Sequence, residues 1–167
     1  MAEKYWHVEE GADAQNSAFP AKQDLSKPLA NLHSLRFSKS ERLCSTKLTD
    51  QLFSEGKAVH KNGFTLVYFF TEVPSVFPAQ VLFSVPKKNF KHSPDRNRVK
   101  RLLRESYRHQ KAELYHFLND KQLQLVVAFI FKGKEIPKAK LVDESVAQLL
   151  AKLQDKTVAL AQKTSMK

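Results

Sequence analysis

Residues 95–118 read DRNRVKRLLRESYRHQKAELYHFL, and their apolar residues recur with the 3.6-residue period of an α-helix. The recurring positions are Val99, Leu102, Leu103, Tyr107, Leu114 and Phe117. Asp95 is predicted to cap this helix, because its carboxylate can accept from free backbone N–H groups at the positive end of the helix dipole. A helix with one apolar face needs a partner layer, so the segments on either side decide the fold.

Three segments are predicted to be strands. Residues 64–71 (FTLVYFFT) are rich in β-branched and aromatic residues, and residues 80–85 (QVLFSV) alternate between two faces. The short connection between these two runs favours antiparallel pairing. Residues 123–131 (LQLVVAFIF) are apolar almost throughout, which is typical of a central strand buried on both faces.

Two more helices are expected. Residues 46–55 (TKLTDQLFSE) follow the cap candidate Ser45 and end before Gly56. The last helix is predicted over about 142–155, with a buried stripe made of Val142, Val146, Leu149, Leu150 and Leu153. The order helix, strand, strand, helix, strand, helix indicates an α+β sandwich with helices packed on one sheet.

The net charge of +11, from 28 basic and 17 acidic residues, is unevenly distributed. Residues 1–35 have a net charge of −2 and no sustained period, so we expect a disordered N-terminal extension. The folded domain is expected over 36–156, and residues 157–167 are expected to fray. The remaining chain therefore has a net charge of +13 and suits an anionic partner such as nucleic acid or a membrane surface.

Cys44 is the only cysteine, which excludes a disulfide framework and fits a reducing compartment. The N-terminus has no apolar run typical of a secretory signal, and no stretch approaches the ~18 apolar residues of a membrane span. We expect a cytoplasmic protein.

Basic residues form a stripe beside the apolar face of the predicted helix over 95–118. On a helical projection the stripe contains Asn97, Lys100, Arg101, Arg104, Arg108 and Lys111. Between residues 87 and 111 there are ten Lys or Arg against two carboxylates, whereas a solvated helix face usually interleaves both signs. Arginine also binds phosphate with two parallel hydrogen bonds. These features favour a nucleic-acid surface over a solvated face, and over a membrane surface, which would need exposed apolar side chains beside the charges.

Protein-based catalysis has little support in the sequence. The two runs over 64–71 and 80–85 contain no Asp, although metal-dependent phosphodiester cleavage needs clustered carboxylates. His109 and His116 are seven residues apart on one helix, but a surface role is several times more common than a metal site. No catalytic and no metal-ligating residue is predicted.

The run 83–108, FSVPKKNFKHSPDRNRVKRLLRESYR, resembles the signature of the bacterial ribonuclease P protein subunit. In that family a strand and a Lys-Lys segment precede Arg-Asn-Arg, then a hydrophobic residue, Lys-Arg, two hydrophobic residues and Arg-Glu. The match extends from Phe83 to Glu105, and the order of elements agrees over about 40–155. The loop 89–95 departs from the pattern, since it lacks the usual glycine and is one residue longer.

The resemblance implies a two-layer α/β sandwich with about four strands, three helices and a left-handed β-α-β crossover. It implies a subunit that helps a catalytic RNA remove the 5′ leader from precursor tRNA, with Mg²⁺ held mainly by the RNA. We expect one protein per RNA subunit. The expected RNA-binding residues are Arg96, Asn97, Arg98, Lys100, Arg101, Arg104, Lys87, Lys88, Arg42 and Arg108.

A separate cleft between the first helix and the sheet is expected, by the same resemblance, to bind the single-stranded leader. Phe53 matches an aromatic position there, and Tyr68 and Phe70 are candidates for stacking on bases. Ordinary core packing is the alternative for these aromatic residues. The alternative function is a structural, ribosome-associated RNA-binding protein without a role in tRNA processing.

Overall fold

The computed structural model describes residues 36–72 and 75–165, with side chains described up to residue 158. In this part of the chain three helices and one four-stranded sheet form the expected α+β fold. The elements are α1 (Thr46–Glu55), β1 (Lys57–Lys61), β2 (Phe64–Thr71), β3 (Ala79–Ser84), α2 (Ser93–Asp120), β4 (Gln124–Phe131) and α3 (Ala139–Ser165). The extension predicted over 1–35 lies outside the described residues.

The sheet has the strand order β1-β2-β4-β3. The prediction of β4 as a central strand is confirmed, because all residues from Leu125 to Phe129 are buried. The expected antiparallel pairing of β2 with β3 is wrong. β4 lies between them, antiparallel to β2 and parallel to β3. A strand that is apolar on both faces buries most surface in the middle of a sheet, so it displaces the pairing that chain proximity favours.

Strand β1 was not predicted from the sequence. It pairs with β2 through a two-residue turn, in which Asn62 has φ 47° and Gly63 has φ 78°. Positive φ at both positions is typical of a type I′ hairpin, for which Asn-Gly is the preferred sequence. The signal for this hairpin was therefore present, but only Val59 of β1 is buried, so β1 has no apolar pattern of its own.

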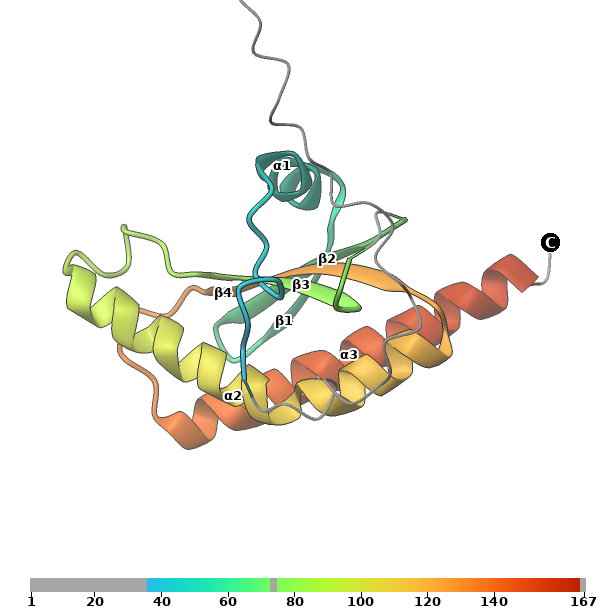
Figure 1. The fold of residues 1–167 in the computed structure, drawn as a ribbon. Coiled ribbons are helices and arrows are strands. Elements are labelled where there is room, and N and C mark those ends of the chain that lie inside the picture. Colours follow the sequence, from blue (N-terminus) through green and yellow to red (C-terminus); the bar gives the residue numbers. More distant parts are fainter. Residues whose placement is uncertain (1–35, 73–74, 166–167) are drawn as a thin grey trace, which may run out of the picture. The chain divides into compact units, whose positions relative to one another are not determined.

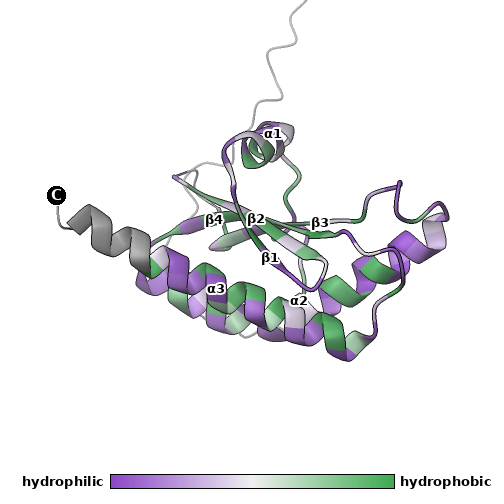
Figure 2. Ribbon diagram, turned by 180° about the vertical axis from the view of Figure 1, so that it is seen from behind, coloured by the Kyte–Doolittle hydropathy of each residue, from purple (hydrophilic) through white to green (hydrophobic). Residues whose placement is uncertain are grey.

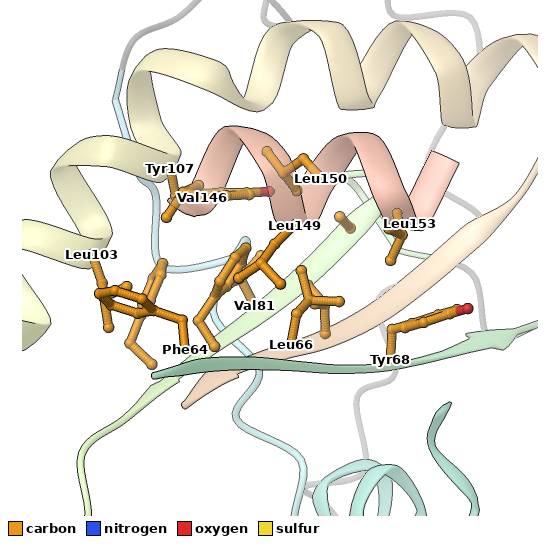
Figure 3. Packing of buried hydrophobic residues seen from close by; sticks show 14 of the residues in the cluster. Phe64, Leu66, Tyr68, Val81, Leu103, Tyr107, Val146, Leu149, Leu150 and Leu153 are labelled. Atoms are coloured by element: carbon orange, nitrogen blue, oxygen red, sulfur yellow. The ribbon is translucent and has the colours of Figure 1, made fainter. Parts of the chain in front are cut away.

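The helices cover both faces of the sheet (Figure 1). Helices α2 and α3 pack on one face, where Phe64, Leu66 and Tyr68 of β2 project toward Leu149 and Leu153 of α3 (Figure 3). The hydrophobic residues of these helices alternate with hydrophilic ones along each helix, as expected for a helix with one buried face (Figure 2). Helix α1 packs on the opposite face and so adds a partial third layer to the predicted two.

The ends of the helices differ from the predictions in two places. Helix α2 begins at Ser93, and its N-cap is His92 rather than Asp95, which lies in the first turn. Pro94 explains the earlier start, because proline suits the first turn of a helix, where its missing N–H is not needed.

The crossover β3-α2-β4 joins neighbouring parallel strands. The left-handed sense of this crossover stays a prediction.

Helix α3 continues to Ser165, so the frayed tail expected from residue 157 is wrong as far as the helix extends. The hydroxyl of Thr157 donates to the carbonyl oxygen of Leu153 at 2.7 Å, and Thr157 is buried. The sequence 157–167 has a weaker apolar pattern than 142–155, which is why periodicity ended the helix too early.

Candidate nucleic-acid interface

The loop before α2 is held by contacts that the sequence did not reveal. Phe90 is buried in the core, with its ring centroid 6.2 Å from that of Phe131. The side-chain amide of Asn89 donates to the carbonyl oxygen of Lys132 at 2.7 Å. The Nη1 group of Arg96 donates to the carbonyl oxygens of Phe90 and Lys91 at 2.9 and 2.8 Å. Arg96 therefore holds the loop in place, which leaves less of its guanidinium for a ligand.

The basic surface of α2 is only partly the one predicted. Arg98, Arg101 and Asn97 are exposed, as are Lys87 and Lys88 in the preceding loop, while Lys100, Arg104 and Arg108 are half-buried. Charged side chains are thus accessible to a ligand along the first half of α2. The structure describes the positions of these side chains, and their contacts with RNA stay a prediction.

Arg104 is a half-buried cation on this surface. Its guanidinium carbon lies 6.0 Å from the centroid of the Phe83 ring, and its buried Nε has no hydrogen-bond partner among the described residues. Burial lowers the pKa of Arg104, and repulsion from Arg42 and Arg101 lowers it further. An anionic ligand beside the guanidinium would offset this repulsion.

Lys111 does not belong to the exposed stripe, although its helical angle placed it there. It is 2% exposed and pairs with Glu41, which is 1% exposed, across a distance of 2.6 Å between Nζ and Oε1. Lys111 Nζ also donates to the carbonyl oxygen of Arg36, and Glu41 Oε2 accepts from the backbone N–H of Ser38 at 3.3 Å. The segment before α1 covers this part of α2 and turns a surface position into a buried one.

That segment, residues 36–43, alternates between anchors and cations. Phe37 contacts the core edge-on, at 5.5 Å from Phe83 between ring centroids, and Leu43 donates its backbone N–H to Val81 of β3 at 3.0 Å. The exposed basic residues between the anchors are Arg36, Lys39 and Arg42. Only Arg42 was predicted, and the available signal was RFSKSERL, in which Phe37, Glu41 and Leu43 separate three cations.

Together, segment 36–43 and α2 line an open hollow of about 610 Å³. Its lining consists of Arg36, Phe37, Ser38, Arg101, Arg104, Glu105 and Arg108. Glu105 is the only carboxylate of the seven, and it accepts from Arg108 Nε at 3.1 Å and lies 3.0 Å from a ring nitrogen of His109. These two hydrogen bonds lower the pKa of Glu105 to about 2. The hollow is therefore strongly positive, because four arginines line it and its one carboxylate is already hydrogen-bonded.

Two of the three aromatic residues expected in the leader cleft lie on the wrong face of the sheet. Tyr68 is 1% exposed and lies beneath the α2 and α3 layer (Figure 3). Phe70 packs against the same core, with its ring centroid 5.9 Å from that of Tyr68. Strand periodicity gives the reason, since Tyr68 and Phe70 share a face with Phe64 and Leu66. Neither ring is placed to stack on a base.

The face beneath α1 has a different set of apolar residues. Leu52 of α1 packs on Val126 and Ala128 of β4, and five half-buried residues surround this contact: Leu48, Val67, Phe69, Leu82 and Ile130. Phe53 follows Leu52 and is 53% exposed, which places it at the flank of the contact between α1 and the sheet. We did not predict Phe69 as a residue of the cleft, although two threonines of β2 share its face and indicate the more open side of the sheet.

No group of three or more His, Cys, Asp or Glu side chains that could hold a metal ion occurs within the described residues. His109 lies beside Glu105 rather than beside a second histidine. In the same part of the chain, no helix has the length and apolarity needed to cross a membrane.

Comparison with known proteins gives one consistent result. A family model described as Ribonuclease P matches residues 37–154. The Ribonuclease P protein component of Porphyromonas gingivalis is 35% identical over 116 residues, which cover 70% of this chain and 85% of that protein. The corresponding protein of Chlorobium phaeobacteroides is 35% identical over 132 residues, 73% of this chain and 90% of its own length.

A solved structure shares the fold. The RNase P protein of Staphylococcus aureus matches with a TM-score of 0.54 at 18% identity, over 68% of this chain and 94% of that chain. At this level of identity the match supports the α+β architecture and the order of its elements.

Proposed function

The chain belongs to the ribonuclease P protein family, as a protein component of that ribonuclease, and from this premise we propose that α2 and segment 36–43 bind its RNA subunit. The contact would be made with the phosphate backbone, because the available groups are arginine and lysine side chains in an open arrangement. The proposed contacts are Arg98, Arg101, Arg104 and Arg108 of α2, with Lys87, Lys88 and Arg42 beside them.

The observation that carries this proposal is the state of Arg104. A half-buried guanidinium with an unsatisfied Nε, next to two other arginines, is unfavourable in the protein alone. A phosphate in the hollow that Arg104 lines would offset this repulsion. Groups in such an environment cluster at functional sites, which supports a functional role.

We propose a second site for the 5′ leader of precursor tRNA on the sheet face beneath α1. Phe53 and Phe69 supply aromatic rings for stacking, and Val67, Leu82 and Ile130 supply an apolar floor. Single-stranded RNA is commonly bound in this way, with unstacked bases against exposed rings. This is the cleft that we predicted between the first helix and the sheet, with Phe53 kept and with Phe69 in place of Tyr68 and Phe70.

In the same proposal the RNA subunit carries out the cleavage and holds the Mg²⁺ ions, while the protein lowers the Mg²⁺ concentration that the reaction needs. Cationic side chains support this division, because they neutralise phosphates that would otherwise need counterions. We further propose one protein per RNA subunit and a cytoplasmic location. The location is supported by a single, exposed and unpaired cysteine, Cys44, which suits a reducing compartment.

Reconstitution tests the proposal. The protein is combined with the ribonuclease P RNA of the same organism, and cleavage of precursor tRNA is followed at low Mg²⁺. We expect the wild-type protein to raise the rate and the variant R101A/R104A to raise it much less. The matched control, K140A/K152A on α3, removes the same net charge from exposed positions and should behave as wild type.

A protein that leaves the cleavage rate unchanged at low Mg²⁺ contradicts the proposal. If both double variants reduce the rate equally, net charge rather than the α2 surface is responsible. The ribosome-associated alternative predicts that ribosomal RNA, rather than the RNA subunit, copurifies with the protein, but no observation on this chain favours it.

A further inference from the structure

A buried ion pair joins Glu41 to Lys111. The proposed RNA surface has two parts, α2 and segment 36–43, and outside this pair Phe37 of the segment meets Tyr107 of α2 edge-on, with ring centroids 6.0 Å apart. Lys111 of α2 connects to this segment twice, through the carboxylate of Glu41 and the carbonyl oxygen of Arg36. The pair therefore sits where the two parts of the surface meet.

Burying a lysine and a glutamate is costly unless both are paired and hydrogen-bonded. Here each has further partners, since Glu41 also accepts from the backbone of Ser38 and the ammonium group lies 5.5 Å from the centroid of the Tyr115 ring. A pair of apolar residues could fill this space at lower cost, but it could not bind the backbone groups of residues 36 and 38. What the ion pair adds is a defined position for the segment.

The position of segment 36–43 determines where its cations lie relative to those of α2. Arg42 follows Glu41 directly, its guanidinium carbon lies 5.8 Å from the centroid of the Phe37 ring, and it is close enough to Arg104 to lower the pKa of that residue. Arg36 lines the same hollow as Arg101 and Arg104. Segment 36–43 runs from α2 past the sheet to α1 and is the blue part of the chain in Figure 1.

We propose that Glu41 and Lys111 are positioning residues that hold segment 36–43 against α2, so that both elements form a single phosphate-binding hollow for the RNA subunit. Neither residue touches RNA. Because the segment is fixed in place before RNA binds, less conformational entropy is lost on binding. The inference rests on the proposed function, because it assigns the hollow to the same RNA.

A double-mutant cycle tests this inference with the full-length protein and the ribonuclease P RNA of its organism. Affinity and its salt dependence are measured for wild type, R42A, K111M and K111M/R42A. In the wild-type background R42A should flatten the slope of log K against log salt by about 0.7–0.9 for the lost phosphate contact. In the K111M background we expect R42A to have little further effect, because the segment no longer holds Arg42 beside Arg104, which lines the hollow.

The exposed Arg98 on α2 is the matched control, because it lies outside the segment. R98A should flatten the slope equally in the wild-type and K111M backgrounds, which also shows that α2 is still folded in the variant. The variant E41Q, which keeps the shape and an acceptor but removes the charge, repeats the cycle with less disturbance of the fold. It should weaken the coupling to Arg42 in the same direction as K111M.

Equal effects of R42A in all three backgrounds would overturn the positioning role and leave the RNA surface on α2 intact. If neither R42A nor R98A changes binding to the RNA subunit even in the wild-type background, the proposed function itself fails. The two failures are therefore distinguishable in one set of measurements.

Discussion

Glu41 and Lys111 are 70 residues apart in the chain, yet Oε1 of one lies 2.6 Å from Nζ of the other in a nearly inaccessible position. This contact fixes the segment before α1 on helix α2 and removes one lysine from the surface that binds RNA in our proposal. Its consequences can be measured separately for stability and for binding.

The variant K111M should lower the free energy of unfolding by about 3–5 kcal/mol, because it leaves the buried carboxylate of Glu41 without its partner. Urea denaturation followed by circular dichroism measures this loss. The exposed Lys140 provides the control, since K140M should change stability by less than about 0.5 kcal/mol. The double variant E41L/K111M should recover most of the loss. A single variant as stable as wild type would mean that the pair is not buried in solution.

Arg96 and Arg98 should behave differently, although both belong to the Arg-Asn-Arg motif. R96A should lower stability by about 1 kcal/mol and increase hydrogen exchange in the loop 86–92, because it removes the donor to the carbonyl oxygens of Phe90 and Lys91. R98A should leave stability unchanged, since Arg98 is exposed. Equal effects on loop exchange would contradict the structural role of Arg96.

Salt dependence tests whether the exposed cations of α2 contact phosphates. R98A/R101A should flatten the slope of log K against log salt by about 1.4–1.8 for two lost contacts with the RNA subunit. The control K140A/K152A should leave the slope unchanged. An unaltered slope for R98A/R101A would show that this part of α2 is a solvated helix face.

The leader site is tested with two aromatic residues on opposite faces of the sheet. F53A should weaken binding of precursor tRNA with a leader by about 1–3 kcal/mol, through the loss of a stacking surface, and leave binding of mature tRNA unchanged. Y68F should not affect either RNA. It should raise stability by about 1 kcal/mol, because the buried Tyr68 hydroxyl has no partner among the described residues. Unchanged leader binding in F53A would contradict the proposed site.

Glu105 should titrate at a pH near 2 rather than near the usual 4.5, because of its hydrogen bonds to Arg108 and His109. Since the folded pKa lies below the unfolded one, the carboxylate stabilises the protein above about pH 4.5, and this contribution is lost as the pH falls toward 2. The side-chain carboxyl signal in an NMR titration measures the pKa. In R108A it should rise toward the usual value, and an unchanged pKa would assign the shift to another group.

Much of the fold could be predicted from short-range pattern. The helical period over 95–118, the cap and stop of α1 and the apolar run of β4 each depend on residues within one element, and the structure confirms those elements. The excess of arginine over carboxylate in the first half of α2 is a local property as well. For the same reason the family motif was recognisable, since it occupies one continuous run.

The errors have a common origin in contacts between distant segments. The side of β2 that carries Tyr68 was weakly specified, because both faces carry aromatic residues and only two threonines mark the other side, and burial beneath α3 settled it. The antiparallel pairing of β2 with β3 failed because β4, which comes later in the chain, buries more surface between them. The helical projection placed Lys111 correctly around the axis of α2, but it could not show that residues 36–43 cover this side chain.

Elements and charge thus follow from the order of residues along the chain, since hydrogen bonds and periodicity within a helix or strand act over a few positions. Strand order, the identity of the open sheet face and the separation of Lys111 from the RNA surface depend on which segments meet after folding. Burial decides those contacts, because it rewards the total apolar surface removed from water and requires every buried charge to be paired.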